Sequence, residues 1–244
     1  MINCRILPAG DCALVVEFGK EIDPKLNSQV QFLRKQLEIL KLPYVIETVP
    51  TFCSLLIYYN PILVSFEKLK NKLNHIVKKQ DLQQSGAENI IEIPVCYDAD
   101  YGPDMENLMM QKNMTRDEII HLHTQPQYLI YMLGFLPGFA YLGGLHPSLH
   151  AKRLDNPRTV IPAGSVGIGG EQTGIYPLDS PGGWQLIGRT PVRPYDKNRS
   201  NPFLYQAGDS IKFVSVTQDE YYKIESGVLE GSYICQVKKG GIVL

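Results

Sequence analysis

The sequence predicts an α+β N-terminal domain, residues 1–85, followed by a mainly-β domain, residues 86–244. Strand-like and helix-like patterns alternate over the first 90 or so residues. A polar run, QDLQQSGAE at 80–88, then interrupts the apolar patterning and is typical of a linker. From residue 128 onward no helical periodicity is expected, because short apolar runs recur between turn signals, as in a barrel or sandwich.

The first domain is expected to contain two helices that cover one side of a small sheet. Asp23 and Pro24 form an N-cap and N1 pair, and apolar residues then recur at 4-3-4-3 spacing from Leu26 to Leu40. Ser65 caps a second helix with one apolar face. The order ββαββαβ predicts that the sheet and both helices form one α+β layer. The strands expected in this order are 2–7, 13–18, 44–49, 53–59 and 89–97, and the last of them follows the boundary at residue 85.

The second domain begins with short helices and continues as strands. Thr115 and Glu118 match a capping box, which predicts a helix that extends through His123. The segments expected as strands beyond it include 159–161, 185–187 and 210–216.

Composition and charge exclude several classes of partner. The formal net charge of -1 gives no electrostatic reason to expect nucleic acid or an anionic membrane as a partner.

The first residues lack the apolar region of a signal peptide. The uncharged stretch 48–66 contains two prolines and an asparagine, so it is interpreted as core strand and turn. Five cysteines without a C-x-x-C pair indicate reduced thiols in a cytoplasmic protein.

The segment 134–191 is the strongest functional signal in the chain. It contains 12 of the 21 glycines, together with Phe139 and the only tryptophan, Trp184. Glycine allows close approach of backbone to backbone or to a ligand. So many special backbone positions between aromatic anchors predict an ordered surface shaped for binding.

A glycine-rich run within this segment has two interpretations. Backbone N–H groups in such a loop can form an anion-binding nest. The run lacks the Lys-Ser/Thr ending of a phosphate loop, and its glycines are also typical of strand crossings and turns. The candidate anion-binding residues are Gly164, Ser165, Gly167, Gly169 and Gly170.

Neutral polar and aromatic side chains follow directly. Gln172, Thr173 and Tyr176 offer donors and acceptors that can orient a small polar ligand in an apolar pocket. Trp184 either walls this pocket or is a core anchor. Arg189 and Arg158 flank the segment, and each guanidinium is a fork for carboxylate or phosphate, or pairs structurally with Asp155 or Asp179.

No metal site or nucleophile is predicted. His121 and His123 lie two residues apart on a helix and point to different faces, so they do not share a metal readily. The sequence contains no G-x-S-x-G elbow. The catalytic residue is therefore unassigned.

Three long runs resemble the signature of one family. They read GFLPGFAYLGGL (134–145), PRTVIPAGSVGIGGEQTGIYP (157–177) and SPGGWQLIGRTP (180–191). They resemble the B subunits of bacterial ATP-dependent 5-oxoprolinase, also described as KipI-type or allophanate hydrolase subunit 1 proteins. The likeness extends to GDCALVVEFG (10–19), IPVCYDADYGPDM (93–105) and GDSIKFVSV (208–216), and so covers essentially the whole chain.

The resemblance implies a cyclophilin-like barrel as the second domain and a complex with subunits C and A. That complex opens 5-oxo-L-proline to L-glutamate with ATP as cosubstrate, bound by this chain or by a partner. On this reading Arg189 holds a carboxylate or phosphoryl oxygen, and Gln172, Thr173 and Tyr176 orient the lactam. Phe139 and Trp184 wall the pocket, and the 164–170 backbone receives developing negative charge.

Two alternatives come with the same family. A KipI-type regulator docks on a histidine kinase and blocks its autophosphorylation. A carboxyltransferase half-site, as in urea carboxylase, is ranked last because the chain has no biotin-attachment motif.

Overall fold

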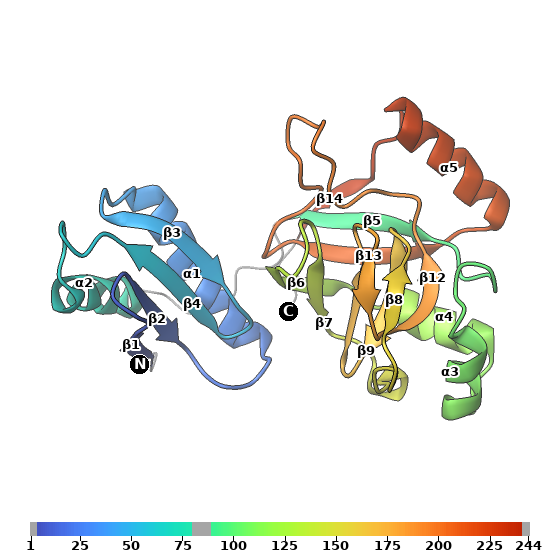
Figure 1. Cartoon of the computed structure of the whole chain (residues 1–244), viewed down its shortest axis with the longest axis horizontal. Helices are drawn as coiled ribbons and strands as arrows, with labels where there is room; N and C mark the ends of the chain where they lie inside the picture. Colours follow the sequence, from blue (N-terminus) through green and yellow to red (C-terminus); the bar gives the residue numbers. More distant parts are fainter. Residues whose placement is uncertain (1–3, 80–88, 241–244) are drawn as a thin grey trace. The chain divides into compact units, whose positions relative to one another are not determined.

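The chain divides into two compact units, residues 1–86 and 87–244, in the computed structural model (Figure 1). The structure describes residues 4–79 and 89–240. The expected linker, 80–88, lies outside the described residues.

The first unit is a four-stranded antiparallel sheet with two helices packed on one face (Figure 1). The strand order is β1-β2-β4-β3, so the hairpin partners β3 and β4 lie at one edge of the sheet. Its elements are β1 Arg5–Pro8, β2 Ala13–Glu17, α1 Pro24–Leu40, β3 Val45–Pro50, β4 Ser54–Tyr59 and α2 Phe66–Lys78.

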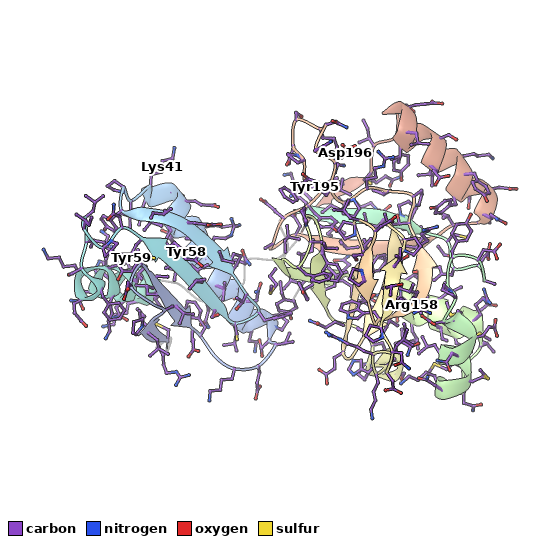
Figure 2. All side chains as sticks on the ribbon, viewed as in Figure 1. Lys41, Tyr58, Tyr59, Arg158, Tyr195 and Asp196 are labelled. Carbon is purple, nitrogen blue, oxygen red and sulfur yellow. The ribbon has the colours of Figure 1, made fainter. Side chains whose placement is uncertain are left out.

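Helix caps and apolar alternation in the sequence predict the helices and strands of this unit correctly. The Asp23 side chain accepts a hydrogen bond from the Lys25 N–H at 2.6 Å and Pro24 follows it, which confirms the predicted start of α1. Ser65 caps α2 as expected. On β4 the exposed Tyr58 and the buried Tyr59, both labelled in Figure 2, show the two-residue alternation of a strand with one covered face.

The core of this unit lies between the sheet and the two helices. Leu14, Leu33, Leu55, Leu69 and Leu73 are all fully buried there. The uncharged stretch 48–66 forms the end of β3, all of β4 and the first residue of α2, as the sequence predicts. No helix among the described residues has both the length and the apolar character to cross a membrane.

The second unit is built on an eight-stranded mixed sheet. Its order is β12-β9-β10-β7-β6-β13-β5-β14, with β5 and β13 parallel and the other pairs antiparallel. A separate pair, β8 and β11, is also antiparallel. The strands are β5 Asn89–Val95, β6 Tyr128–Leu133, β7 Ala140–Gly143, β8 Arg158–Ile161, β9 Ser165–Gly169, β10 Gln172–Ile175, β11 Ser180–Gly182, β12 Gln185–Arg189, β13 Ser210–Ser215 and β14 Val237–Lys239.

Four helical segments accompany this sheet among the residues that the structure describes. Thr115 caps α4 with both bonds of a capping box, which confirms that prediction. The segments are α3 Met105–Lys112, α4 Arg116–Thr124, α5 Gln218–Glu230 and the short 3₁₀ helix η1 Pro147–Leu149.

The large sheet is not a closed barrel in the described residues, since its strand order ends at β12 on one side and β14 on the other. A single antiparallel bridge joins Cys96, just after β5, to Arg189, the last residue of β12. Its two N–H···O bonds both measure 2.9 Å. The fold shown is therefore a mixed α/β fold in which the sheet curls until these two strands meet at one point.

Two expectations about the elements were wrong. The strand expected at 89–97 forms as β5 and lies beyond the predicted boundary at residue 85, but counting it in the first α+β layer was wrong, because β5 pairs with β13 over six consecutive positions. The region beyond residue 128 contains a 13-residue helix, α5, where no helix was expected. Long-range pairing with β13 determines which sheet β5 joins. The helix α5 was missed because its N-cap, Thr217, was overlooked.

Candidate functional site

The aromatic residues of the glycine-rich segment form one cluster on the second unit. The ring centroid of Phe139 lies 5.4 Å from that of Tyr176 and 5.5 Å from that of Trp184, both in edge-to-face geometry. These three side chains are at most 4% exposed. They belong to a small core cluster of their own, together with Ile161 and Leu186.

The glycines of β9 and β10 accommodate Trp184. A Cβ built on Gly169 would lie 2.4 Å from the indole Nε1, and one on Gly174 would lie 3.0 Å from the indole ring. A Cβ built on Gly167 would lie 3.2 Å from the Cβ of Trp184. The three glycines Gly167, Gly169 and Gly174 are therefore explained by the close approach of Trp184 to two strands.

The expected anion nest at 164–170 does not fit this geometry. The N–H groups of Gly164, Ser165 and Gly170 donate to backbone carbonyls, at 2.7, 3.2 and 2.7 Å respectively. Gly167 and Gly169 lie within β9, which has antiparallel neighbours on both sides. Backbone donors engaged in a sheet interior are not available to an anion.

Thr173 faces the main core of the unit. It is fully buried, and its hydroxyl donates to the Gly167 carbonyl at 3.0 Å. The same oxygen lies 2.8 Å from Nε2 of His123. The Thr173 hydroxyl is therefore engaged within the core, where it links β10 to β9 and to His123.

His123 is the centre of this buried network. Because the single Thr173 hydroxyl proton goes to Gly167, His123 Nε2–H is the donor between them. Nδ1 is then the acceptor for the Tyr97 hydroxyl at 2.7 Å. Burial lowers the pKa of His123 to about 3, so the ring is neutral at physiological pH.

Gln172 and Arg189 each have side-chain nitrogens without a hydrogen-bond partner among the described residues. Gln172 begins β10, and its buried Nε2 has no hydrogen-bond partner among the described residues. Arg189 ends β12, and its Nε donates to the Ala163 carbonyl at 3.1 Å. Arg189 is four residues from the start of β12, roughly 13 Å along the strand. Trp184 precedes that start, so the predicted site residues do not converge on one point.

Arg158 pairs with a residue that sequence reasoning did not consider. Its Nη2 lies 2.6 Å from Oδ1 of Asp104, which is buried at the start of α3. The other oxygen of Asp104 accepts from the Leu186 N–H at 2.6 Å. Arg158, labelled in Figure 2, thus joins β8 to α3 and β12, and neither Asp155 nor Asp179 is its partner.

An open hollow of about 650 Å³ lies beside the aromatic cluster. None of the predicted binding residues lines it. Arg153 connects the two features, because its guanidinium lies over the Trp184 ring at 6.0 Å from the centroid. The lining residues are Asn107, Gln111 and Lys112 of α3, His150 to Asp155, and Gln185 at the start of β12.

Sequence reasoning missed this hollow. The adjacent cations Lys152 and Arg153 and the position of Gln185 beside Trp184 were the available signals. The third cation, Lys112, comes from a helix about 40 residues earlier, and only the tertiary fold brings it to the same place.

The described residues contain no group of three or more metal-ligating side chains. His121 is exposed and His123 is buried, so the two lie on different faces of α4, as the helical spacing predicts. Burial raises the pKa of the Cys96 and Cys235 thiols to about 11. Both are protonated at neutral pH and unsuited to act as nucleophiles.

The chain is similar to curated proteins over most of its length. A family model described as carboxyltransferase domain, subdomain C and D, matches residues 4–205. The 5-oxoprolinase B subunit of Bacillus subtilis (strain 168) is 39% identical over 92% of this chain and 99% of that protein. The corresponding B subunit of Haemophilus influenzae is 39% identical over 86% of this chain and 97% of that protein.

Solved structures show the same fold. The crystal structure of TTHA0988 is 33% identical with a TM-score of 0.75, over 84% of this chain. The match covers 40% of that chain, so this chain spans about two fifths of its length. The K. lactis urea amidolyase, 21% identical, has a TM-score of 0.78 over 97% of this chain and 16% of its own, a likeness of fold alone. The chain belongs to the carboxyltransferase domain, subdomain C and D, family, and within it to the 5-oxoprolinase B subunits.

Proposed function

We propose that this chain is the B subunit of an ATP-dependent 5-oxoprolinase. It acts together with subunits A and C to open 5-oxo-L-proline to L-glutamate. One observation carries the proposal, namely the 39% identity with a curated 5-oxoprolinase B subunit over 92% of this chain and 99% of that protein. The proposed compartment is the cytoplasm, and the proposed form of the second unit is a cyclophilin-like barrel whose seam is the Cys96–Arg189 bridge.

The proposed chemistry explains why ATP is needed. An unstrained five-membered lactam is a poor electrophile. Transfer of the γ-phosphoryl group of ATP to its oxygen, with ADP as the leaving group and loss of the N–H proton, activates the ring carbon. Water then adds, the C–N bond breaks as the nitrogen is protonated, and a second water releases phosphate and L-glutamate. Catalysis of this kind depends on positioning and on neutralising phosphate charge.

In this scheme the chain contributes binding groups to a composite site. Gln172 Nε2 is a buried donor without a partner in the described part of the chain, which suits a lactam carbonyl. The Arg189 guanidinium is held by Ala163 through Nε, and its two terminal nitrogens take part in none of the hydrogen bonds of the described residues. We assign it to a substrate carboxylate or a phosphoryl oxygen.

The buried aromatic residues have a supporting role in this proposal. Phe139, Tyr176 and Trp184 pack beneath the surface and fix the strands that carry the polar groups. Base, nucleophile and any residue that completes the site then come from subunits A and C. An incomplete site on this chain is expected for one part of a composite enzyme.

The test is reconstitution with purified candidate A and C subunits. Release of L-glutamate from 5-oxo-L-proline is measured with and without ATP, and with each subunit omitted in turn. Turnover that needs ATP and all three subunits is expected. Full turnover in the absence of this chain would refute the proposal, and binding to a histidine kinase without turnover in the mixture would favour the regulator.

A carboxyltransferase half-site is the second candidate. The observation in its favour is the match to the carboxyltransferase family model, together with 29% identity to a putative urea carboxylase of Emericella nidulans over 50% of this chain. It requires a biotin-carrying partner. Transfer of a carboxyl group from carboxybiotin by the same reconstituted mixture, with no glutamate release, would replace the first proposal with this one.

A further inference from the structure

The hollow beside the aromatic cluster is lined by an excess of positive charge. Lys112, Lys152 and Arg153 face it, and Asp155 is the only carboxylate among its lining residues. None of the three cations takes part in an ion pair within the described residues. Three cations against one carboxylate leave an excess of positive charge around the opening, which favours a ligand with more than one negative charge.

Gln185 provides an independent sign of a ligand. Its side chain lines the hollow and is only 4% exposed. Its Nε2 donates to the Lys152 carbonyl at 3.1 Å, whereas its buried Oε1 has no partner in the described part of the chain. A buried acceptor without a donor is costly. The ligand that satisfies it carries a hydroxyl or amine group in addition to its negative charges.

The walls of the hollow are held in place before any ligand arrives. Lys112 Nζ donates to the His150 carbonyl, which ties α3 to the facing loop. Ala151 and Gly170 exchange two backbone hydrogen bonds, at 3.1 and 2.7 Å. Arg153 lies over the indole of Trp184. The cations are therefore attached to fixed backbone, which lowers the entropic cost of binding.

We propose that this hollow binds an organic polyphosphate of the nucleotide class. The phosphate oxygens contact Lys112, Lys152 and Arg153, and a hydroxyl or amine donor of the ligand pairs with Gln185 Oε1. A volume of about 650 Å³ suits a ligand of nucleotide size better than a single phosphate. The inference rests on the proposed function only in that ATP is chosen as the probe.

Trp184 makes the test direct, because it is the only tryptophan and Arg153 contacts its ring. Trp184 emission of the full chain is followed during titration with ATP and, separately, with inorganic tripolyphosphate. Isothermal calorimetry provides a second readout free of inner-filter effects. Saturable binding of both is expected, with ATP tighter because only ATP supplies a donor to Gln185.

Three variants separate the contributions. Lys152→Ala weakens both ligands by about tenfold, since it removes a charge-assisted contact to phosphate. Gln185→Leu removes the preference for ATP over tripolyphosphate. Because it also removes the bond to the Lys152 carbonyl, tripolyphosphate is expected to weaken too, but by less than in Lys152→Ala. Lys197→Ala, the matched control, removes an exposed lysine outside the hollow and leaves both affinities unchanged.

Either of two results overturns the inference: no saturable binding of either probe to the full chain, or equal affinities in Lys152→Ala and Lys197→Ala. The same variants in the reconstituted complex keep the two proposals distinguishable. ATP-dependent turnover without binding in the hollow leaves the proposed function standing and places the nucleotide elsewhere. Binding in the hollow without turnover in any mixture supports the site and refutes the proposed function.

Discussion

The indole of Trp184 lies so close to Gly169 that a Cβ on this glycine would sit 2.4 Å from Nε1. No real Cβ contact is that short, so either the ring or the strand β9 has to move when a side chain is added. The chain's only tryptophan and its glycine-rich strands are therefore two parts of one packing arrangement.

Gly169→Ala is expected to lower the free energy of unfolding by about 1–3 kcal/mol, the usual cost of overpacking a rigid core. Gly183→Ala is the matched control in the same segment. Its added Cβ meets the nearest atom at 3.6 Å, an ordinary contact, so the change is expected to stay within about 0.5 kcal/mol. Urea denaturation followed by Trp184 emission measures both, and equal effects would contradict the packing argument.

Thr173→Val tests whether Thr173 is a supporting residue or a ligand contact. The substitution keeps the shape and leaves His123 Nε2–H and the Gly167 carbonyl without their partner. We expect a loss of about 2–4 kcal/mol in unfolding free energy, the cost of two buried unsatisfied groups. Thr173→Ser keeps the hydroxyl and is expected to cost about 1 kcal/mol. If Thr173→Val has wild-type stability but loses substrate binding, Thr173 is a ligand contact and not a supporting residue.

Stability is expected to fall as the pH drops below 6.5, because His123 resists protonation in the folded chain. Its pKa is lowered by burial to about 3, against 6.5 for an ordinary histidine. Between these values the unfolded chain binds a proton that the native chain does not, so folding loses up to about 1.4 kcal/mol per pH unit. His123→Gln is expected to flatten this dependence between pH 7 and 5, while the exposed His121→Gln keeps it. Parallel pH profiles of the two variants would contradict the assignment.

Much of the first unit was predictable because its elements are specified by local signals. The cap at Asp23 and the apolar faces of both helices are contained within a few residues of sequence. The assignment of β5 was not predictable in this way, since its parallel partner, β13, lies about 120 residues away. The helix α5 was predictable, because Thr217 and Glu220 form the same capping box that was recognised at Thr115.

The candidate site was predicted as a region and not as a geometry. Phe139, Tyr176 and Trp184 do come together. Thr173 points into the core instead, because alternate residues of β10 face opposite sides of the sheet. The hollow could not be predicted from local sequence patterns, because α3 and the 150–155 loop come together only in the tertiary fold.

Asp104→Asn is expected to destabilise the second unit by about 1–3 kcal/mol. The buried carboxylate of Asp104 accepts from both Arg158 and the Leu186 N–H, and the amide leaves the Arg158 charge without its counter-ion. Arg158 is partly exposed, which places the cost below that of a fully buried pair. Glu17→Gln, which breaks the surface pair with Arg5, is the control and is expected to change little. Thermal unfolding of Asp104→Asn and Glu17→Gln compares the two losses of stability.

Arg189→Ala is expected to reduce kcat/KM of the reconstituted complex by about 100-fold while leaving this subunit folded. Its backbone forms the bridge to Cys96 whatever the side chain, and the side chain contributes one partly exposed hydrogen bond to Ala163. The stability change is therefore expected to stay within about 1 kcal/mol. Loss of a charge-assisted contact to a carboxylate or phosphoryl group accounts for the kinetic effect.

Two further variants decide what the Arg189 guanidinium does. Arg189→Lys keeps the charge without the planar fork, so little activity is expected to return if the contact is bidentate. Arg193→Ala removes an exposed arginine whose ion pair with Asp196 is long, at 3.9 Å, and is expected to behave as wild type. Full rescue by lysine would indicate a purely electrostatic contact. Near-wild-type turnover of Arg189→Ala would remove Arg189 from the site and leave Gln172 as the polar group to test next.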